Sequence, residues 1–134
     1  MSERHFTPEE VDALIPRLAD IVGRAMHRHE QATALQQALH EEQERIRTSG
    51  GGLIDRRDWK ARAERLDGLA IEVRQALQEI AALGGVTKDL TMGLVDFPGE
   101  VGNETVNLCW KHGETAVRFW HGLDEGYAQR KPLP

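Results

Sequence analysis

The most chemically suggestive stretch of the 134-residue sequence is His121-Gly122-Leu123-Asp124-Glu125, near its C-terminal end. A histidine that leaves a strand can converge with the carboxylates that follow it if the chain turns at Gly122, and Asp96, which leaves another predicted strand, can join them. The group His121, Asp124 and Asp96 suits a divalent metal such as Zn, Mn or Fe. The same three side chains can form an acid–base site in which an aspartate orients the histidine. In a purely structural alternative, Asp124 caps a final turn and His121 donates to a backbone carbonyl or to Asp96.

The single cysteine, Cys109, is a second candidate for chemistry. A nucleophile or a soft metal ligand must be a thiolate, which a neighbouring cation, a helix N-terminus or a metal stabilises. Lys111 and Arg118 share the predicted sheet face of Cys109, so such a cation is available. The alternative is a structural thiol, half-buried beside Trp120. One cysteine excludes an internal disulfide and is typical of a reducing compartment.

The remaining candidates are binding residues in the same tail. Arg130 can contact a carboxylate or an anionic ligand, or it can pack its guanidinium group on Trp120 or Trp110. Glu114 can pair with Lys111 across the strand ends, a contact worth about 0.5 kcal/mol. Exposed tryptophan together with arginine is typical of interface hot spots. The tail is therefore also a candidate surface for a protein partner.

Two long helices must position this tail. Thr7-Pro8-Glu9-Glu10 forms a capping box with proline at the first helical position, and heptad-like apolar spacing, as in a coiled coil, continues to about residue 47. Pro16 lies inside this helix and predicts a kink. The glycine-rich segment 48–52 predicts a turn, and a second amphipathic helix follows over about 58–83. These segments predict an antiparallel helical hairpin over residues 7–85.

The periodicity changes after residue 86, where β-branched and aromatic residues alternate with polar ones. The segments 105–111 and 115–120 flank His112-Gly113, which predicts a tight β-hairpin. Pairing Lys111 with Glu114 places Leu108 opposite Val117, and residues 94–97 predict a short third strand that ends at Pro98-Gly99. We therefore expect a single α+β domain, 1–134, in which a small antiparallel β-sheet of two or three strands forms the β-rich tail, residues 86–134.

The motifs of the tail resemble those of a known family. Gly93-Leu94-Val95-Asp96-Phe97-Pro98 is followed by Leu108-Cys109-Trp110, Trp120-His121 and Gly126-Tyr127. Together with Phe6-Thr7 and Pro16, this order over nearly the whole chain resembles a bacterial family called domain of unknown function 2203. Tyr127 departs from the pattern, in which phenylalanine is expected. The resemblance implies a helical front, a β-rich tail and a bacterial, cytoplasmic, uncharacterised protein, and it supplies no reaction.

Composition excludes several function classes. The formal net charge is −5 with no basic patch, which is unlike proteins that bind nucleic acid by neutralising phosphates or that anchor to membranes through polybasic segments. No apolar run approaches the roughly 18–20 residues that span a bilayer, and the polar start of the chain predicts no secretory signal peptide. We therefore expect a cytoplasmic protein that binds neither nucleic acid nor membrane.

The hairpin itself predicts self-association. Both helices carry apolar stripes that one partner helix cannot cover, and two hairpins paired as a four-helix bundle would cover them. Two hypotheses about function follow from the sequence. The first is a non-enzymatic interaction or scaffold module that forms a homodimer through its helices, and the second is a metal-dependent or acid–base enzyme at His121, Asp124 and Asp96.

Overall fold

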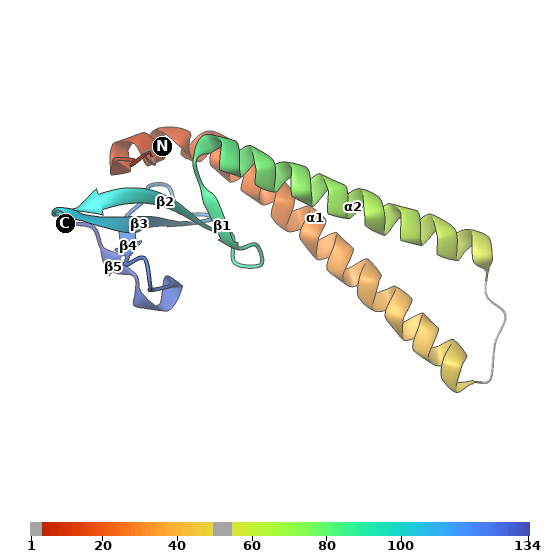
Figure 1. Ribbon diagram of the computed structural model, residues 1–134. Helices are drawn as coiled ribbons and strands as arrows, with labels where there is room; N and C mark the ends of the chain where they lie inside the picture. The colour runs from red at the N-terminus through yellow and green to blue at the C-terminus, as the bar shows by residue number, and fades with distance from the viewer. Residues whose placement is uncertain (1–3, 50–54) are drawn as a thin grey trace.

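The computed structural model describes residues 4–49 and 55–134, and it shows two long helices followed by a β-sheet (Figure 1). The structure does not describe residues 50–54, so residues 50–52 of the predicted glycine-rich turn lie outside the described residues. Its elements, in chain order, are α1 (Pro8–Thr48), α2 (Arg56–Leu83), β1 (Val86–Asp89), β2 (Leu94–Val101), β3 (Glu104–Lys111), β4 (Phe119–His121), a short 3-10 helix (Tyr127–Gln129) and β5 (Lys131–Pro132).

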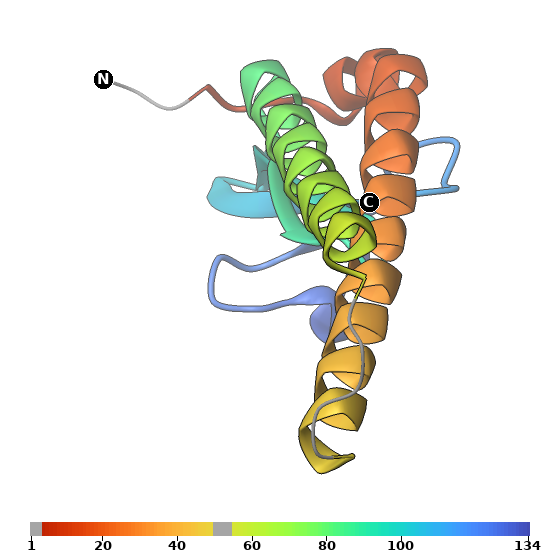
Figure 2. The same cartoon turned by 90° about the vertical axis from the view of Figure 1, so that its right-hand side faces the viewer.

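The helical hairpin is confirmed. The Thr7 hydroxyl accepts from the Glu10 amide at 3.1 Å while the Glu10 carboxylate accepts from the Thr7 amide at 2.9 Å, which is the predicted capping box. Asp55 caps α2, so this helix begins at Arg56, two residues earlier than expected. The two helices run antiparallel and extend well beyond the sheet (Figures 1 and 2), and α1 changes direction near its N-terminal end, the part that contains Pro16. No helix in the described ranges is long and apolar enough to span a bilayer.

The sheet is larger than the sequence indicated. It has five antiparallel strands in the order β1-β2-β3-β4-β5, so the expectation of two or three strands was wrong. The missed strands lie at its two edges and are short: β1 has four residues and β5 has two. A strand of two residues contains too little alternation to stand out in a sequence, and Pro132 in β5 argues against a strand.

Strand β2 continues through Pro98-Gly99, where the sequence predicted its end. Pro98 pairs with Asn107 of β3, whereas β1 pairs only with residues 94–96 of β2. The Pro98 carbonyl accepts a hydrogen bond from the Phe6 amide at 2.7 Å, on the edge of β2 that β1 covers only as far as residue 96. Because the nitrogen and carbonyl of one strand residue point to the same side, the missing N–H of Pro98 faces this edge and interrupts no strand pairing.

The predicted register between β3 and β4 was also wrong. The turn at Lys111–Glu114 forms, with the Glu114 amide donating to the Lys111 carbonyl at 3.0 Å, but the chain then leaves the sheet. The Val117 amide donates instead to the Asp12 carboxylate of α1 at 2.8 Å. Pairing resumes with Leu108 opposite Trp120, three residues beyond the expected partner. An odd shift exchanges the two faces of β4.

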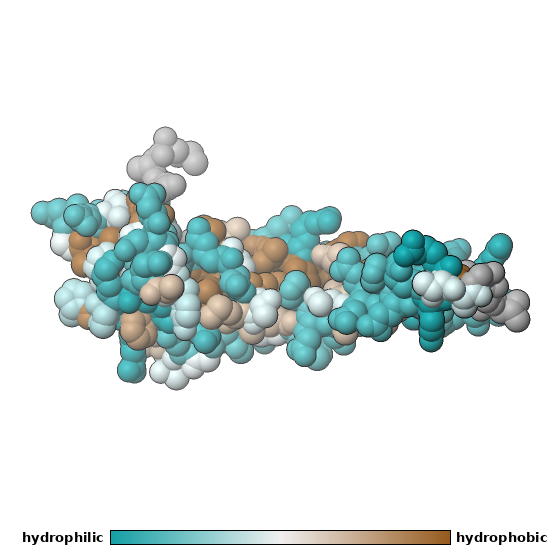
Figure 3. Space-filling view, turned by 90° about the horizontal axis from the view of Figure 1, so that it is seen from below, coloured by the Kyte–Doolittle hydropathy of each residue, from teal (hydrophilic) through white to brown (hydrophobic). Residues whose placement is uncertain are grey.

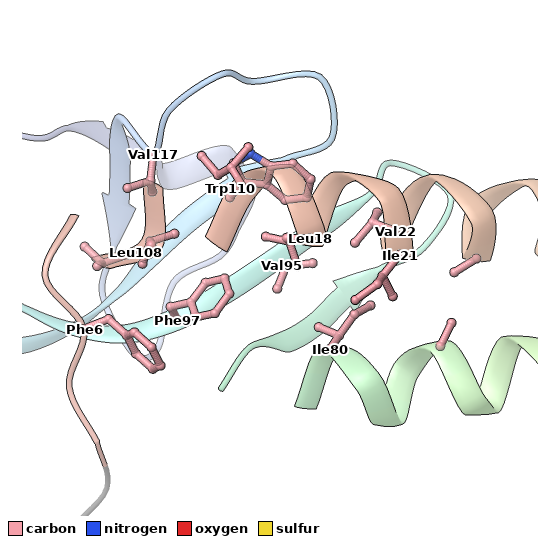
Figure 4. Close-up of a cluster of buried hydrophobic side chains, with 14 of the residues drawn as sticks. Phe6, Leu18, Ile21, Val22, Ile80, Val95, Phe97, Leu108, Trp110 and Val117 are labelled. Carbon is pink, nitrogen blue, oxygen red and sulfur yellow. The ribbon is translucent and has the colours of Figure 1, made fainter. Parts of the chain in front are cut away.

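The hydrophobic core lies between one face of the sheet and the part of the hairpin nearest to it, which is the N-terminal half of α1 and the C-terminal end of α2 (Figure 4). Trp110, Phe97 and Leu108 from the sheet are fully buried against Leu18 of α1 and Ile80 of α2. Helices and sheet therefore share one core, and the opposite face of β2, β3 and β4 is left for the C-terminal segment to cover.

Leu18→Ala should lower the free energy of unfolding by about 2–5 kcal/mol, because Leu18 is fully buried between α1 and the sheet. The same change at Leu123, which is 61% exposed, should cost less than about 0.5 kcal/mol. Urea unfolding followed by circular dichroism measures both. Equal losses at the two positions would show that the core is not where the structure places it.

Candidate functional site

The corrected register brings Asp96, Cys109 and His121 together on the face of the sheet that points away from the helices. Asp96 pairs directly with Cys109, and His121 lies two residues along β4 from Phe119, the partner of Cys109, and so on the same face. All three residues are buried, with exposed fractions of 2%, 1% and 2%. One ligand atom from each lies within 4.8 Å of the other two. Three central strands thus place a carboxylate, a thiol and an imidazole around one point.

His121 is held by both of its ring nitrogens. Nδ1 lies 2.9 Å from the Gly122 carbonyl oxygen, and Nε2 lies 3.0 Å from Oδ2 of Asp96. A carbonyl oxygen only accepts hydrogen bonds, so Nδ1 carries a proton and donates it. This contact fixes the orientation of the ring and directs Nε2 at the Asp96 carboxylate.

The Asp96 carboxylate is buried beside one potential cation, His121, and it has no hydrogen-bond donor among the described residues. Although its Oδ2 lies close to His121, neither carboxylate oxygen accepts a hydrogen bond from any residue in the described part of the chain. Burial raises the pKa of this carboxyl, and the opposing attraction of His121 is smaller. A buried carboxylate without donors costs several kcal/mol unless a proton or a metal ion neutralises it.

Cys109 is a buried thiol in its resting form. Burial, reinforced by the neighbouring Asp96 carboxylate, raises the pKa of Cys109 to about 12. Burial, and not the cations Lys111 and Arg118 that the sequence suggested, therefore determines the pKa of Cys109. Without a metal, Cys109 is no activated nucleophile.

A small pocket of about 120 Å³ opens beside the three side chains. Lys88 of β1 and Asn107 of β3 line it from the sheet, while Leu123, Glu125 and Tyr127 line it from the C-terminal segment. The positive charge of Lys88 acts on the Asp96 carboxylate and opposes the rise in its pKa. The buried cluster thus borders a small pocket that charged and apolar side chains line together.

Arg130 fastens the C-terminal segment over this face. Its Nη2 donates to both carboxylate oxygens of Glu114, at 2.9 and 2.8 Å, and its guanidinium carbon lies 4.0 Å from the ring centroid of Phe119. The sequence predicted a carboxylate or a tryptophan as the partner of Arg130, and the structure shows a carboxylate and a phenylalanine. At the start of the segment, the Glu125 carboxylate accepts from the Gly122 amide at 2.7 Å and from Lys131 at 2.5 Å.

The other predicted site residues lie apart from the cluster. Asp124 is exposed and does not line the pocket. Trp120 is half-buried on the opposite face of the sheet, with the Lys131 ammonium 4.6 Å from its ring centroid. Trp110 is fully buried in the core and is therefore not part of the surface of the tail. A protein partner at the tail stays a prediction, and the large exposed apolar side chains in the described part of the tail are Val86, Leu123 and Tyr127.

Sequence reasoning missed Lys88 and Tyr127 as neighbours of the site and separated Cys109 from His121. Lys88 lies in the missed strand β1, and Tyr127 reaches the pocket through a loop whose path no periodicity predicts. The i, i+2 spacing of strand residues placed Asp96 and Cys109 on definite faces, but the face of His121 depended on the register of β4.

The chain belongs to the family described as uncharacterized conserved protein (DUF2203), whose model matches residues 4–133. No curated protein and no solved structure matches it. Family membership therefore supplies no reaction, and the geometry of the site carries the functional argument.

Cys109 of the metal-free, native protein should not react with Ellman's reagent at pH 8. The side chain is 1% exposed, and with a pKa of about 12 only about one thiol in ten thousand is ionised at that pH. Absorbance of the released dye should rise only after unfolding in guanidinium chloride. Complete reaction of the native protein within minutes would contradict both the burial and the raised pKa.

Proposed function

We propose that this DUF2203 protein binds one divalent transition-metal ion, zinc being the best match, through Asp96, Cys109 and His121. The observation that carries the proposal is the Asp96 carboxylate, which is 2% exposed, lacks any hydrogen-bond donor among the described residues and faces a ring nitrogen of His121. A metal ion between these groups satisfies the carboxylate oxygen and the nitrogen lone pair at once.

The hydrogen bond of His121 supports a ligand role. In metal sites, the coordinating histidine usually donates its other ring N–H to a carbonyl or a carboxylate, which fixes its tautomer. Here Nδ1 donates to the Gly122 carbonyl, so Nε2 has a lone pair available. Without a proton or a cation in between, that lone pair and the Asp96 oxygen repel each other at 3.0 Å.

The donor set supports zinc among the metals expected from the sequence. Zinc accepts thiolate, imidazole and carboxylate ligands together, whereas Mn prefers oxygen ligands. Ligand atoms around a tetrahedral zinc ion are separated by roughly 3.3–3.5 Å, given its usual bond lengths. The three side chains bring such atoms within 4.8 Å, so modest rotamer adjustments close the site. A reduced cysteine ligand also fits the proposed cytoplasmic location.

The acid–base alternative is less well supported by the geometry. A catalytic histidine uses one ring nitrogen for its orienting carboxylate and leaves the other for substrate. In this structure a backbone carbonyl, that of Gly122, orients His121 through Nδ1, and Nε2 points at Asp96 rather than away from it, so the His–Asp pair does not have the arrangement of a general base and its orienting carboxylate.

Protein stripped with a chelator and reloaded should bind one zinc ion per chain, measured by elemental analysis. Asp96→Asn and Cys109→Ser should each weaken binding more than about 100-fold, which exceeds the effect typical of a residue that only supports a ligand. Asp124→Asn is the matched control, since it is the same change at an exposed carboxylate outside the pocket, and it should bind as the wild type does.

Cobalt reports on the ligands directly. The Co²⁺-loaded wild type should show thiolate-to-metal charge-transfer absorption, and Cys109→Ser should lose it. Zinc should raise the midpoint temperature of thermal unfolding of the wild type, and it should leave that of Asp96→Asn unchanged. If no metal binds and Asp96→Asn merely lowers stability, the Asp96–His121 contact is a structural pair and the proposal fails.

We also propose that two copies of the chain pair through the distal hairpin, residues 29–48 of α1 and 56–72 of α2. Only Leu39 and Leu69 are buried in these two segments. The space between the helices contains two adjoining hollows of about 280 and 550 Å³, in which Ile46 and Trp59 line the first and Leu39 and Leu66 line the second. On the underside of the molecule, Figure 3 shows hydrophobic side chains over the middle and a mainly hydrophilic surface over the distal end of the hairpin, so the proposed interface includes many polar side chains.

The chemistry of these hollows favours a second copy as the occupant. Most of the polar lining residues are uncharged, Gln36, Gln37 and Gln43 among them, and Arg56 is the one formally charged residue in the described lining. A side-chain amide both donates and accepts, so a glutamine surface can meet its own copy across a two-fold axis without like-charge repulsion, as an isologous dimer requires.

The available area is adequate for a dimer. The distal hairpin is about 30 Å long. Its two helices, each about 10 Å across, make it about 20 Å wide, so its face has a projected area of roughly 600 Å². That area is comparable with the roughly 800 Å² of accessible surface that each partner contributes to a standard interface. Arg28 and Glu42 are charged residues that interrupt the heptad-like apolar spacing of α1. Both form ion pairs within the chain, since Arg28 lies 3.1 Å from Glu72 and Glu42 pairs with Arg62.

Sedimentation equilibrium at micromolar concentration should therefore give twice the 15.1 kDa chain mass. Gln36→Glu combined with Gln43→Glu should yield monomers, because each copy would bring two negative charges to the shared face. Gln78→Glu is the control on an exposed part of α2 outside both hollows, and it should remain dimeric. A wild-type monomer, or a dimer insensitive to the double change, would overturn the proposed pairing.

A further inference from the structure

The pocket beside the proposed metal ligands has a composition that suits an anion. It is lined by Asp96, Cys109 and His121 at its base and by Lys88 at its edge. Asn107 and Tyr127 add an amide and a hydroxyl, both able to donate a hydrogen bond. Its one other carboxylate, Glu125, is already bonded to the Gly122 amide and to Lys131.

We propose that this pocket binds a small carboxylate-type anion, such as acetate or bicarbonate, as an exchangeable ligand of the bound metal, with Lys88 as its counter-charge. The inference rests on the proposed metal site and extends it. Three protein ligands leave the fourth position of a tetrahedral ion open, which is the arrangement of zinc sites that exchange ligands rather than of closed structural sites.

The dimensions of the pocket limit the ligand to a few heavy atoms. Its volume of about 120 Å³ is well below the roughly 300–1,000 Å³ of pockets that enclose drug-sized ligands. A nucleotide or a peptide is far larger, so only one small group can lie beside the metal. The walls include Leu94 and Leu123, which suit a short apolar end such as the methyl group of acetate.

Electrostatics favours an anion over a neutral ligand. A divalent cation bound by the Asp96 carboxylate and the Cys109 thiolate has no net charge left, and Lys88 then supplies an uncompensated positive charge at the pocket edge. Lys88 already interacts with the Asp96 carboxylate across this space. A charge-assisted hydrogen bond from Lys88 to the second oxygen of a metal-bound carboxylate would hold such a ligand in place.

Co²⁺-loaded protein titrated with sodium acetate, and separately with bicarbonate, tests the proposal through visible absorption bands that depend on the ligands of the ion. Acetate or bicarbonate should change the spectrum saturably, whereas chloride at the same ionic strength should change it less. Lys88→Gln should weaken the binding of acetate about tenfold, the effect of losing one charge-assisted hydrogen bond. Lys60→Gln, an exposed lysine of the distal α2 helix, should bind acetate as the wild type does.

The outcomes separate the two proposals. A Co²⁺ spectrum with thiolate charge transfer that neither anion alters would overturn the anion pocket and leave the metal site standing. Anion binding that Lys88→Gln does not weaken would overturn the role of Lys88 and with it the proposed pocket. Failure of the wild type to bind Co²⁺ at all would overturn both the metal site and this inference.

Discussion

The structure of the tail depends on one contact, the 3.0 Å approach of the Asp96 carboxylate to the His121 ring inside a buried sheet face. A carboxylate at this depth must be neutralised, because burial without donors or a counter-charge is too costly. Its neighbours are arranged around that requirement. The imidazole is oriented by the Gly122 carbonyl, the Cys109 thiol lies alongside, and the C-terminal segment covers all three.

The helices and the site occupy opposite faces of the same sheet. One face of β2 and β3 packs Phe97, Leu108 and Trp110 against the hairpin, which fixes the strands rigidly. The other face is then free to carry polar side chains, and the strand pairing sets their spacing. The Arg130–Glu114 pair closes the C-terminal segment over that face, so the cluster is buried although it lies outside the main core.

The helical half of the fold could be predicted from the sequence, whereas the details of the sheet could not. The Thr7 capping box and the long apolar periodicity are local signals, and they fixed the hairpin. The register of β4 depends on contacts between residues far apart in the sequence. The chief one is the hydrogen bond that the Val117 amide donates to the Asp12 carboxylate of α1 instead of to a neighbouring strand. That one contact shifts β4 by three residues and moves His121 to the face of Cys109. Asp96 and His121, two of the residues that the sequence singled out, therefore lie together in the structure, and Cys109 rather than Asp124 lies beside them.

X-ray absorption at the zinc edge of the zinc-loaded protein reports which atoms surround the ion. A site made of Asp96, Cys109 and His121 should give one sulfur ligand at about 2.3 Å together with nitrogen or oxygen ligands at about 2.0–2.2 Å, and Cys109→Ser should lose the sulfur shell. A zinc ion surrounded only by oxygen and nitrogen in the wild type would show that the metal binds elsewhere. That result would leave the buried Asp96–His121 contact without a metal and contradict the account.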